Sequence, residues 1–426
     1  MQLTPEQQAV LDGSRGEVMA KVMKTLVIYG DTFGATKMVP VTGQCGHLVT
    51  SFGLGVLGPV YQLMDQLIEA GALSGQKFTA DPRPLDSNVP ANFLQNTLFK
   101  IMYSKQDFYE KQLQSLGLLN EDGFTCTCYL TEVGNRPSHG DVLSWAESSA
   151  VVFANSVLGA RCNRNSGILE LFGSIAGCVP YFGLLTDEGR MASWIVDIKT
   201  SELPEAQLLG SAIGLKVMED VPYIRGLAPF LGEDVHQEHI EAYLKDMGAA
   251  TASNGAVGLF HVDRITPEAA EQGDRLIRDN ARHYIIDDAE LARVKAAYPC
   301  IWQNPNAKPK LCFVGCPHLT LYQIKNWIAR LDDGLKRNGL QKVRIPTVFT
   351  AAPAVCKQLS QLPLTARLRE MGIVVSSICP LMYMNNPLCA KMPVITNSNK
   401  LRTYSSARYH TDEEIVTLLT EGGSRS

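Results

Sequence analysis

Three cysteines that lie far apart in the chain could act together on a metal. Cys126, Cys316 and Cys379 each stand beside a strand-like run, and proline follows both Cys316 and Cys379. Three thiolates can hold an iron–sulfur cluster and leave one iron without a protein ligand; such an iron is a Lewis acid that can draw a hydroxyl group off a substrate. The chain has no local Cys-x-x-Cys run, so buried thiols that only fill the core are the competing interpretation.

The residues near these cysteines leave two questions open. Cys126 and Cys128 would face the same side of a strand, so either or both could reach a metal. Cys312, Cys316 and His318 could instead bind zinc, but a fourth ligand would have to come from elsewhere. We favour a hydrogen bond from His318 to the cluster region.

A carboxylate stands in a stretch that is otherwise apolar. Residues 142–158 contain few charges and predict a buried helix, and Glu147 lies within it. A buried carboxylate without a partner is costly, so Glu147 either pairs with Arg161 or Arg164 or has a role in substrate binding or acid–base chemistry. The donors just past this helix would suit a carboxylate or a phosphate.

The run Gly53-Leu-Gly-Val-Leu-Gly58 matches the glycine pattern of dinucleotide-binding turns. It follows a possible strand at 47–52 and precedes a helix. However, that strand is half polar and Pro59 comes directly after the last glycine. We therefore favour a turn whose backbone N–H groups approach an anionic substrate, with an ordinary turn as the alternative.

Composition limits the class of protein. A chain of 426 residues needs two or three domains, and 45% hydrophobic with 19% charged residues is the balance of a globular enzyme. A net charge of −4 without a run of Lys or Arg argues against nucleic-acid binding. No apolar run has the length of a membrane span, the N-terminus lacks a signal-peptide pattern, and eleven cysteines indicate a reducing compartment, so we expect a cytoplasmic protein.

The elements that must position these residues follow from capping signals and periodicity. Thr4 and Gln7 predict a capping box for a first helix, and Ser14 and Glu17 predict the same for a second. A third helix is expected from Pro59 until just before Gly71, and residues 80–94 are expected to form a loop.

From about residue 231 short apolar runs alternate with helical stretches, which is typical of an α/β sheet with parallel strands. The expected strands are 256–260, 311–314, 346–349, 373–378 and 393–396. Ligands bind beyond the carboxyl ends of such strands, and Cys316, Cys379 and Asn397 each stand just past one of them. We divide the chain into an N-terminal catalytic region, 1–230, and a C-terminal α/β region, 231–426.

The motifs that hold these residues resemble the large, catalytic subunit of the aconitase X family. The matching stretches are 125–130, 145–161, 315–318 and 396–400. The resemblance implies an aconitase-like multi-region α/β fold, with parallel and mixed sheets around an iron–sulfur cleft, and the activity of a hydro-lyase. It places the cluster ligands at Cys126, Cys316 and Cys379. Family members of the archaeal type have proline at the position of Cys128, which favours Cys126 as the ligand.

The resemblance also suggests the residues that contact substrate. Glu147 and Ser148 are expected to act in catalysis. The residues expected to bind substrate are Gly46, His47, Thr50, Ser51, Asp81, Pro82, Arg161, Asn397 and Lys400. A small swivelling domain, which supplies a catalytic serine in aconitase-type enzymes, has no counterpart that we recognise in this sequence. We therefore expect a small partner subunit and a heterodimer.

Two substrates are known for the family, phosphomevalonate and cis-3-hydroxy-L-proline. Asp81 stands where the archaeal type has asparagine. A carboxylate there would repel a phosphate and pair with a ring ammonium, so we expect the hydroxyproline substrate, with phosphomevalonate as the alternative. A non-catalytic binding subunit with structural cysteines is the alternative from another class.

Overall fold

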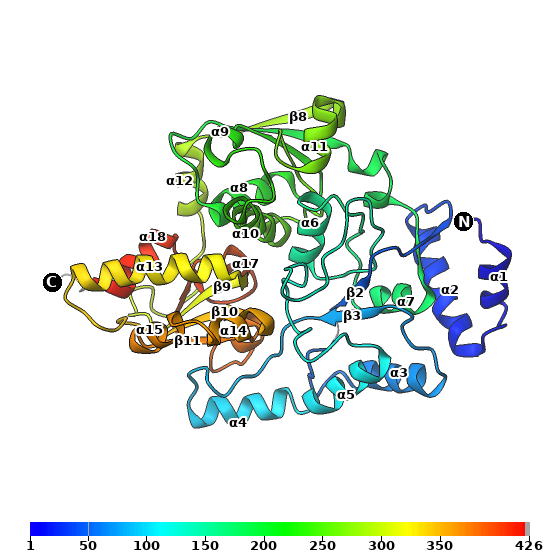
Figure 1. The fold of residues 1–426 in the computed structure, drawn as a ribbon, viewed down its shortest axis with the longest axis horizontal. Coiled ribbons are helices and arrows are strands. Elements are labelled where there is room, and N and C mark those ends of the chain that lie inside the picture. Colours follow the sequence, from blue (N-terminus) through cyan, green and yellow to red (C-terminus); the bar gives the residue numbers. More distant parts are fainter. Residues whose placement is uncertain (50, 422–426) are drawn as a thin grey trace.

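The computed structural model describes residues 1–49 and 51–421 as a mixed α/β protein (Figure 1). The N-terminal helices α1 and α2 lie at one end of the long axis, and the helices α13 and α18 lie toward the other. None of the helices in the described chain is long and apolar enough to cross a membrane. Four sheets organise the structure, and the two larger ones contain only parallel strand pairs.

The larger sheet has five strands in the order β11-β10-β9-β12-β13. Its strands are β9 (Leu311–Leu319), β10 (Thr347–Ala351), β11 (Ile373–Ser376), β12 (Val394–Thr396) and β13 (Arg408–Tyr409). Every residue of β9 is buried, as in strands that are covered on both faces. The chain runs outward from β9 through β10 to β11 and then returns to the other side of β9 with β12. The order of strands therefore reverses between β9 and β12, where ligands bind in open α/β sheets.

The expected strands of this sheet are confirmed, with one exception. Four of the predicted runs coincide with β9 to β12, whereas residues 256–260 form no strand and end just before β7 (His261–Val262). The helices around this sheet are α13 (Leu321–Arg337), α14 (Pro353–Ser360), α15 (Leu364–Glu370), α16 (Pro380–Met384), α17 (Asn399–Tyr404) and α18 (Asp412–Thr420).

A second parallel sheet, β7-β6-β5-β8, was not expected from the sequence. Its other strands are β5 (Ala192–Ile198), β6 (Pro222–Arg225) and β8 (Ile277–Ile286). The helices of this part are α8 (Ala206–Val217), α9 (Ala228–Leu231), α10 (Glu238–Asn254), α11 (Pro267–Gln272) and α12 (Asp288–Ala296). Helices α8 and α10 pack closely because Gly210 has no side chain, and a Cβ there would lie 2.2 Å from the Met247 carbonyl oxygen.

Two short sheets and several helices form the N-terminal part. The antiparallel pair is β1 (Met38–Pro40) with β4 (Cys178–Pro180), and the parallel pair is β2 (Cys45–Leu48) with β3 (Lys77–Ala80). The helices are α1 (Pro5–Leu11), α2 (Glu17–Thr32), α3 (Gly58–Glu69), α4 (Phe93–Met102), α5 (Gln106–Leu116), α6 (Ser148–Ser156) and α7 (Leu169–Ala176). Leu48 pairs with Ala80, so the residues that follow β2 and β3 lie side by side.

The capping predictions have different outcomes at the first two helices. Thr4 and Gln7 form the expected capping box of α1. The box predicted from Ser14 and Glu17 is wrong, because α2 starts directly after Gly16, whose φ of 86° places it in the left-handed region. Such a backbone suits glycine, and this helix has no side-chain cap.

Candidate iron–sulfur and substrate site

The five-stranded sheet positions two of the three cysteines at its carboxyl edge. Cys316 lies within β9, which is longer than predicted and continues beyond it. The pairing of β9 with β10 shifts register here, and the backbone at Gly315 is left-handed with φ 105°. A Cβ on Gly315 would lie 2.6 Å from the Thr350 carbonyl oxygen, so this bend needs glycine. Cys379 follows β11 and is the N-cap residue of α16.

The third cysteine comes from the N-terminal part. Phe124 bridges to Ala80 at the end of β3, and the chain then turns without forming a strand. Cys126 is half-buried, whereas Cys128 is fully buried in the apolar core. The prediction that Cys126 and Cys128 share one face of a strand is therefore wrong. Of the two, Cys126 is the thiol near the other cysteines, since its pKa responds to Cys316.

His318 connects the three cysteine segments. Its Nδ1 atom lies 2.9 Å from the Thr125 hydroxyl, and its Nε2 atom lies 3.1 Å from the Ile378 carbonyl oxygen. Its backbone N–H donates to the Cys126 sulfur at 3.4 Å. The side chain of His318 thus contacts the residues next to Cys126 and Cys379, and because both of its ring nitrogens have protein partners it is not free to bind zinc.

The three thiols are the residues that could hold an iron–sulfur cluster. In the described chain no three His, Cys, Asp or Glu side chains are arranged to hold one ion. Burial raises the pKa of Cys126 and Cys316, and raises that of Cys379 to about 12, so each thiol needs a cation to become a thiolate ligand. Cys126 and Cys379 each interact electrostatically with Cys316.

Glu147 lies at the start of α6, not inside a helix as predicted. The helix begins at Ser148 because the Glu147 side chain caps it, accepting from the Ala150 N–H at 2.6 Å and from the Ser149 hydroxyl at 2.7 Å. Its other carboxylate oxygen accepts from the Lys400 ammonium. The partner of Glu147 is therefore Lys400, from α17 after β12, and not Arg161 or Arg164.

The ammonium of Lys400 has three hydrogen-bond acceptors around it. Besides Glu147, these are the Ser148 hydroxyl at 3.3 Å and the Ser149 hydroxyl at 3.2 Å. Burial opposes charge on both members of the pair, but the Lys400 ammonium holds the pKa of Glu147 below its ordinary value. In turn Glu147, followed by Cys316 and Cys126, raises the pKa of Lys400. Both groups stay charged at neutral pH, within electrostatic range of two of the thiols.

His47 and Asp81 leave buried polar atoms without partners. His47 in β2 contacts the Thr79 hydroxyl through Nδ1 at 2.8 Å, and its Nε2 atom lies 3.8 Å from an Asp81 oxygen. Neither of these two atoms has a hydrogen-bond partner among the described residues. Burial lowers the pKa of His47 to about 4 and raises that of Asp81 well above its ordinary value. Buried polar atoms left unpaired indicate a missing ligand.

Other residues expected to bind substrate lie on the same pair of strands. Gly46 is buried in β2, where a Cβ would lie 2.6 Å from the Ser174 hydroxyl. Pro82 and Ser51 are buried just past β3 and β2. Thr50 lies outside the described residues.

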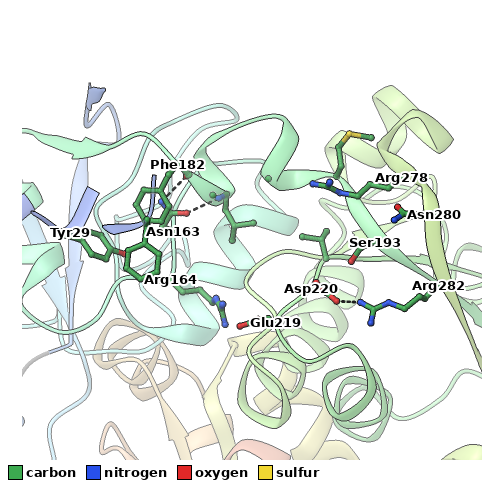
Figure 2. A pocket seen from close by; sticks show the side chains of 16 residues that line it. Tyr29, Asn163, Arg164, Phe182, Ser193, Glu219, Asp220, Arg278, Asn280 and Arg282 are labelled. Carbon is green, nitrogen blue, oxygen red and sulfur yellow. Dashed lines mark hydrogen bonds and ion pairs between the residues drawn. The ribbon is translucent and has the colours of Figure 1, made fainter. Parts of the chain in front are cut away.

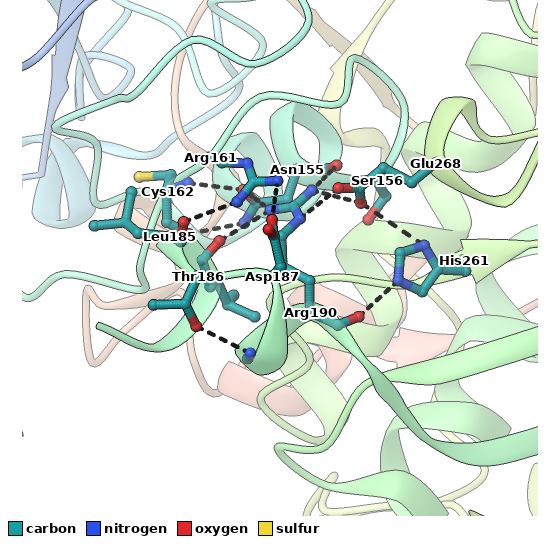
Figure 3. A network of polar contacts seen from close by, with 12 residues as sticks. Asn155, Ser156, Arg161, Cys162, Leu185, Thr186, Asp187, Arg190, His261 and Glu268 are labelled. Carbon is teal, nitrogen blue, oxygen red and sulfur yellow. Dashed lines mark hydrogen bonds and ion pairs between the residues drawn. The ribbon is translucent and has the colours of Figure 1, made fainter. Parts of the chain in front are cut away.

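Two predicted site residues lie elsewhere. Arg161 donates to the Leu185 carbonyl and pairs with Asp187 at 2.5 Å, in a polar network beside the second sheet (Figure 3). Asn397 donates to Asp412 at 2.9 Å, at the start of α18. The structure does not bring either of them to the Glu147–Lys400 pair.

The glycine turn at 53–58 packs against protein rather than forming a nucleotide loop. The Gly55 N–H donates to the Met102 carbonyl and the Gly53 carbonyl accepts from the Lys105 N–H. This turn therefore joins the end of α4 to the region after β2.

A large cavity of about 840 Å³ lies away from the thiols (Figure 2). Aromatic side chains of α2, including Tyr29, line one side of it, and arginines of β8, including Arg282, line the other. Arg282 pairs there with Asp220. None of the residues predicted to bind cluster or substrate lines this cavity.

Family models match nearly the whole chain. They are described as the aconitase X first domain over residues 1–188, the second domain over 192–296 and the third domain over 309–419. The chain belongs to the aconitase X family. The fold is also similar to a crystal structure of Thermococcus kodakaraensis aconitase X in the holo-form, with a TM-score of 0.80 and 28% identity, over 98% of this chain and 100% of that one.

Curated relatives of this aconitase X chain carry two names. The phosphomevalonate dehydratase large subunits of Thermococcus kodakarensis and Aeropyrum pernix are 31% and 28% identical, over 95% and 96% of both chains. The cis-3-hydroxy-L-proline dehydratase of Pseudomonas aeruginosa is 26% identical over 93% of this chain and 65% of that protein. All are dehydratases, which confirms the prediction of a hydro-lyase. The comparison favours the alternative substrate, phosphomevalonate, over the hydroxyproline that we expected from Asp81.

Sequence reasoning missed the pairing that organises the site. Lys400 was expected only as a substrate contact, and no spacing rule connects it with Glu147, 253 residues away. The available signal was its position directly after a strand of a parallel sheet.

Proposed function

We propose that this chain is the large, catalytic subunit of an iron–sulfur hydro-lyase that removes water from a β-hydroxycarboxylate, with phosphomevalonate as the substrate. The observation that carries the proposal is the buried Glu147–Lys400 pair, which interacts electrostatically with Cys126 and Cys316. One charged pair, the thiols and the unpaired polar atoms lie close to one another where the end of the five-stranded sheet meets the N-terminal part. This arrangement is expected of an active site rather than of a structural core.

The donor set suits the cluster. Cys126, Cys316 and Cys379 would hold it, with the His318 backbone N–H donating to one sulfur ligand. When bound, such a cluster with one open iron provides a Lewis acid for the leaving hydroxyl.

The charged pair is suited to positioning the substrate. All described contacts of the Glu147 carboxylate are with donors, and its pKa is low, so it is a weak base. Its role is to keep Lys400 charged and directed. Lys400 and the half-buried Ser148 hydroxyl would then hold the substrate carboxylate. The proton next to that carboxylate would pass to the His47 imidazole, whose pKa is lowered to about 4 by burial and whose Nε2 atom has no partner among the described residues.

Two observations support phosphomevalonate over cis-3-hydroxy-L-proline. The relatives named for phosphomevalonate include those of higher identity, and they match over nearly their full length. In addition, burial raises the pKa of Asp81 well above its ordinary value, which disfavours the charged form that would repel an anion. Burial therefore works against the charge argument that we made from the sequence.

A small subunit completes the proposed enzyme. Relatives that this chain matches over about 95% of their length are named large subunits, which supports a second chain. The longer hydroxyproline enzyme, of which this chain spans 65%, has room for a further domain.

The test is a dehydration assay of the anaerobically purified chain co-expressed with its small subunit. We expect turnover of phosphomevalonate, with kcat/KM changed by no more than about threefold in Asp81→Asn, because burial disfavours the charge of this carboxyl and an amide has a similar shape. If cis-3-hydroxy-L-proline is the preferred substrate, and Asp81→Asn lowers its kcat/KM by about 10-fold or more, the substrate assignment is wrong.

A further inference from the structure

Exposed apolar side chains gather on the outer side of α4. Phe93 is 81% exposed, and Leu94 and Ile101 are each 65% exposed. Val56 in the glycine turn is 86% exposed and Phe108 in α5 is 41% exposed. Val56 and Phe93 are the two most exposed large apolar side chains in the described chain. We name these five residues the α4 face.

The helical period places the α4 residues on one stripe. At 100° per residue, Phe93, Leu94 and Ile101 fall within an arc of about 100°, whereas Gln95 and Phe99 point the opposite way and are buried. Figure 1 shows α4 at the edge of the molecule, with no other element on its outer side in that view. A helix that is apolar on both sides fits a position between a protein core and a partner.

The glycine turn extends this stripe. The Gly55 N–H donates to the Met102 carbonyl at 2.8 Å, and the Lys105 N–H donates to the Gly53 carbonyl at 3.1 Å. These bonds hold the turn that carries Val56 against the joint between α4 and α5. Phe108 lies in the first turn of α5, and the Lys105 ammonium lies over its ring.

The buried side of α4 reaches the thiol region. The Phe99 ring lies 5.3 Å from the ring of Tyr383, and the Tyr103 hydroxyl donates to the Met382 carbonyl at 2.8 Å. Both partners belong to α16, whose N-cap is Cys379.

The loop that precedes α4 also contacts this region. The Arg83 carbonyl accepts from the Cys379 N–H at 2.9 Å, two residues after Asp81. Helix α4 and the loop before it thus carry the α4 face on their outer side. On their inner side they adjoin the predicted site residues Asp81 and Cys379.

We propose that the α4 face is the docking surface of the small subunit, an inference that rests on the two-subunit function proposed above. The five side chains expose roughly 500–600 Å² of apolar surface, at the upper end of what monomers leave uncovered. One partner contributes about 800 Å² to a standard interface, so this face would be most of its apolar centre. A small subunit is the occupant that we infer rather than a second copy, because relatives that match this chain over about 95% of their length are named large subunits. Binding there would also fix the elements that hold Asp81 and Cys379. Assembly and activity would then be coupled.

Calorimetric titration of the holo chain with the small subunit encoded in the same genome tests the inference. We expect Phe93→Ser/Ile101→Ser to weaken Kd at least about 100-fold and Ile101→Ser alone about 10-fold. The matched control is Ile301→Ser, because Ile301 is 61% exposed and lies outside the face; its Kd should stay within about twofold. All three variants should melt within about 2 °C of wild type, since the side chains are exposed.

Hydrogen exchange gives an independent measurement on the unchanged chain. Amides of α4 should exchange more slowly once the small subunit is bound, and unchanged exchange there would overturn the inference. So would a Kd for Phe93→Ser/Ile101→Ser within about twofold of wild type.

Two further outcomes separate this inference from the proposed function. The wild-type chain could bind the small subunit and turn over substrate while the double variant binds the small subunit equally well. In that case only the proposed docking surface is wrong. If wild type does not bind a small subunit at all, the two-subunit function and the docking surface fail together. A wild-type chain that sediments alone as a dimer, with Phe93→Ser/Ile101→Ser a monomer, would show a second copy as the occupant and overturn the proposal.

Discussion

Two of the buried ion pairs in the described part of the chain differ in what surrounds them. Arg190 and Glu268 form a two-pronged pair at 2.7 and 2.8 Å beside the second sheet (Figure 3). The remaining guanidinium N–H groups go to Leu184 and to two oxygens of Asn155, so all five donors of Arg190 are used. Glu147 and Lys400 are similarly buried and similarly bonded, yet they lie within electrostatic range of thiols and of the unpaired atoms of His47 and Asp81.

The difference shows that a buried charge pair does not identify a site by itself. The other donors of Arg190 contact backbone and amide oxygens, so that the pair holds the last turn of α6 against the second sheet. The Lys400–Glu147 pair caps the first turn of the same helix, next to groups that lack partners. Unpaired polar atoms next to the ion pair, rather than burial of the pair, distinguish the candidate site from the structural Arg190–Glu268 pair.

The largest expected effect is at the thiols. Cys126→Ala, Cys316→Ala and Cys379→Ala should each reduce bound iron and turnover to background, because each removes a cluster ligand. Cys389→Ala, at a buried thiol outside the site, and Cys300→Ala, at an exposed thiol, should keep both. Iron analysis and the dehydration assay measure this. Normal iron in any of the three site variants would remove that cysteine from the cluster.

A smaller effect is expected at the site pair. Glu147→Gln should lower kcat by about 10²-fold or more, since Lys400 loses the charge that directs it. The iron content should stay near that of wild type. Steady-state kinetics on the holo enzyme measure the change, and a kcat within about threefold of wild type would show that the pair is only structural.

The scaffold pair should respond in the opposite way. Glu268→Gln should lower the free energy of unfolding by about 3–5 kcal/mol, because it leaves the Arg190 charge buried and unpaired. The kcat of the folded fraction should change by less than about threefold. Chemical denaturation and kinetics together separate the two pairs. A large loss of kcat without a loss of stability would place Arg190 and Glu268 in the active site and break the comparison.

The smallest expected effect concerns Glu170, a third buried carboxyl near the site. Burial raises its pKa to about 8, and one of its oxygens has no partner among the described residues. Between about pH 4.5 and pH 8 the folded chain therefore holds a proton that the unfolded chain releases, and stability falls as the pH rises. Glu170→Gln should reduce that fall by about 2–4 kcal/mol across this window. Denaturation at several pH values measures it, and an unchanged slope would assign the fall to other groups.

Local signals in the sequence predicted much of the fold. The capping box of Thr4 and the apolar runs of β9 to β12 act through neighbouring residues, so they could be recognised without the structure. Strand β8 could not, because three of its ten residues are charged and interrupt the apolar pattern: it lies at the edge of the second sheet and exposes much of its length. The division of the chain at residue 230 stays a prediction.

The site was predicted less completely than the fold. The cysteines and Glu147 stood out by residue type and by their neighbours in the sequence. His318 contacts the segments of Cys126 and Cys379, and its role beside a cluster stays a prediction. The pairing of Glu147 with Lys400 depends on how β12 lies beside β9, which is a tertiary fact that no local pattern contains. The contact of Arg161 with Asp187 could not be predicted for the same reason, and a role for Arg161 in substrate binding stays a prediction.

The most direct test of this account is the metal content of the wild-type chain. We predict that anaerobically purified or reconstituted protein is brown and contains iron together with acid-labile sulfide, and that a chelator removes the colour and the activity together. Protein that turns over substrate yet stays colourless and retains no iron or sulfide after anaerobic reconstitution would contradict the central claim that Cys126, Cys316 and Cys379 hold a cluster beside the Glu147–Lys400 pair.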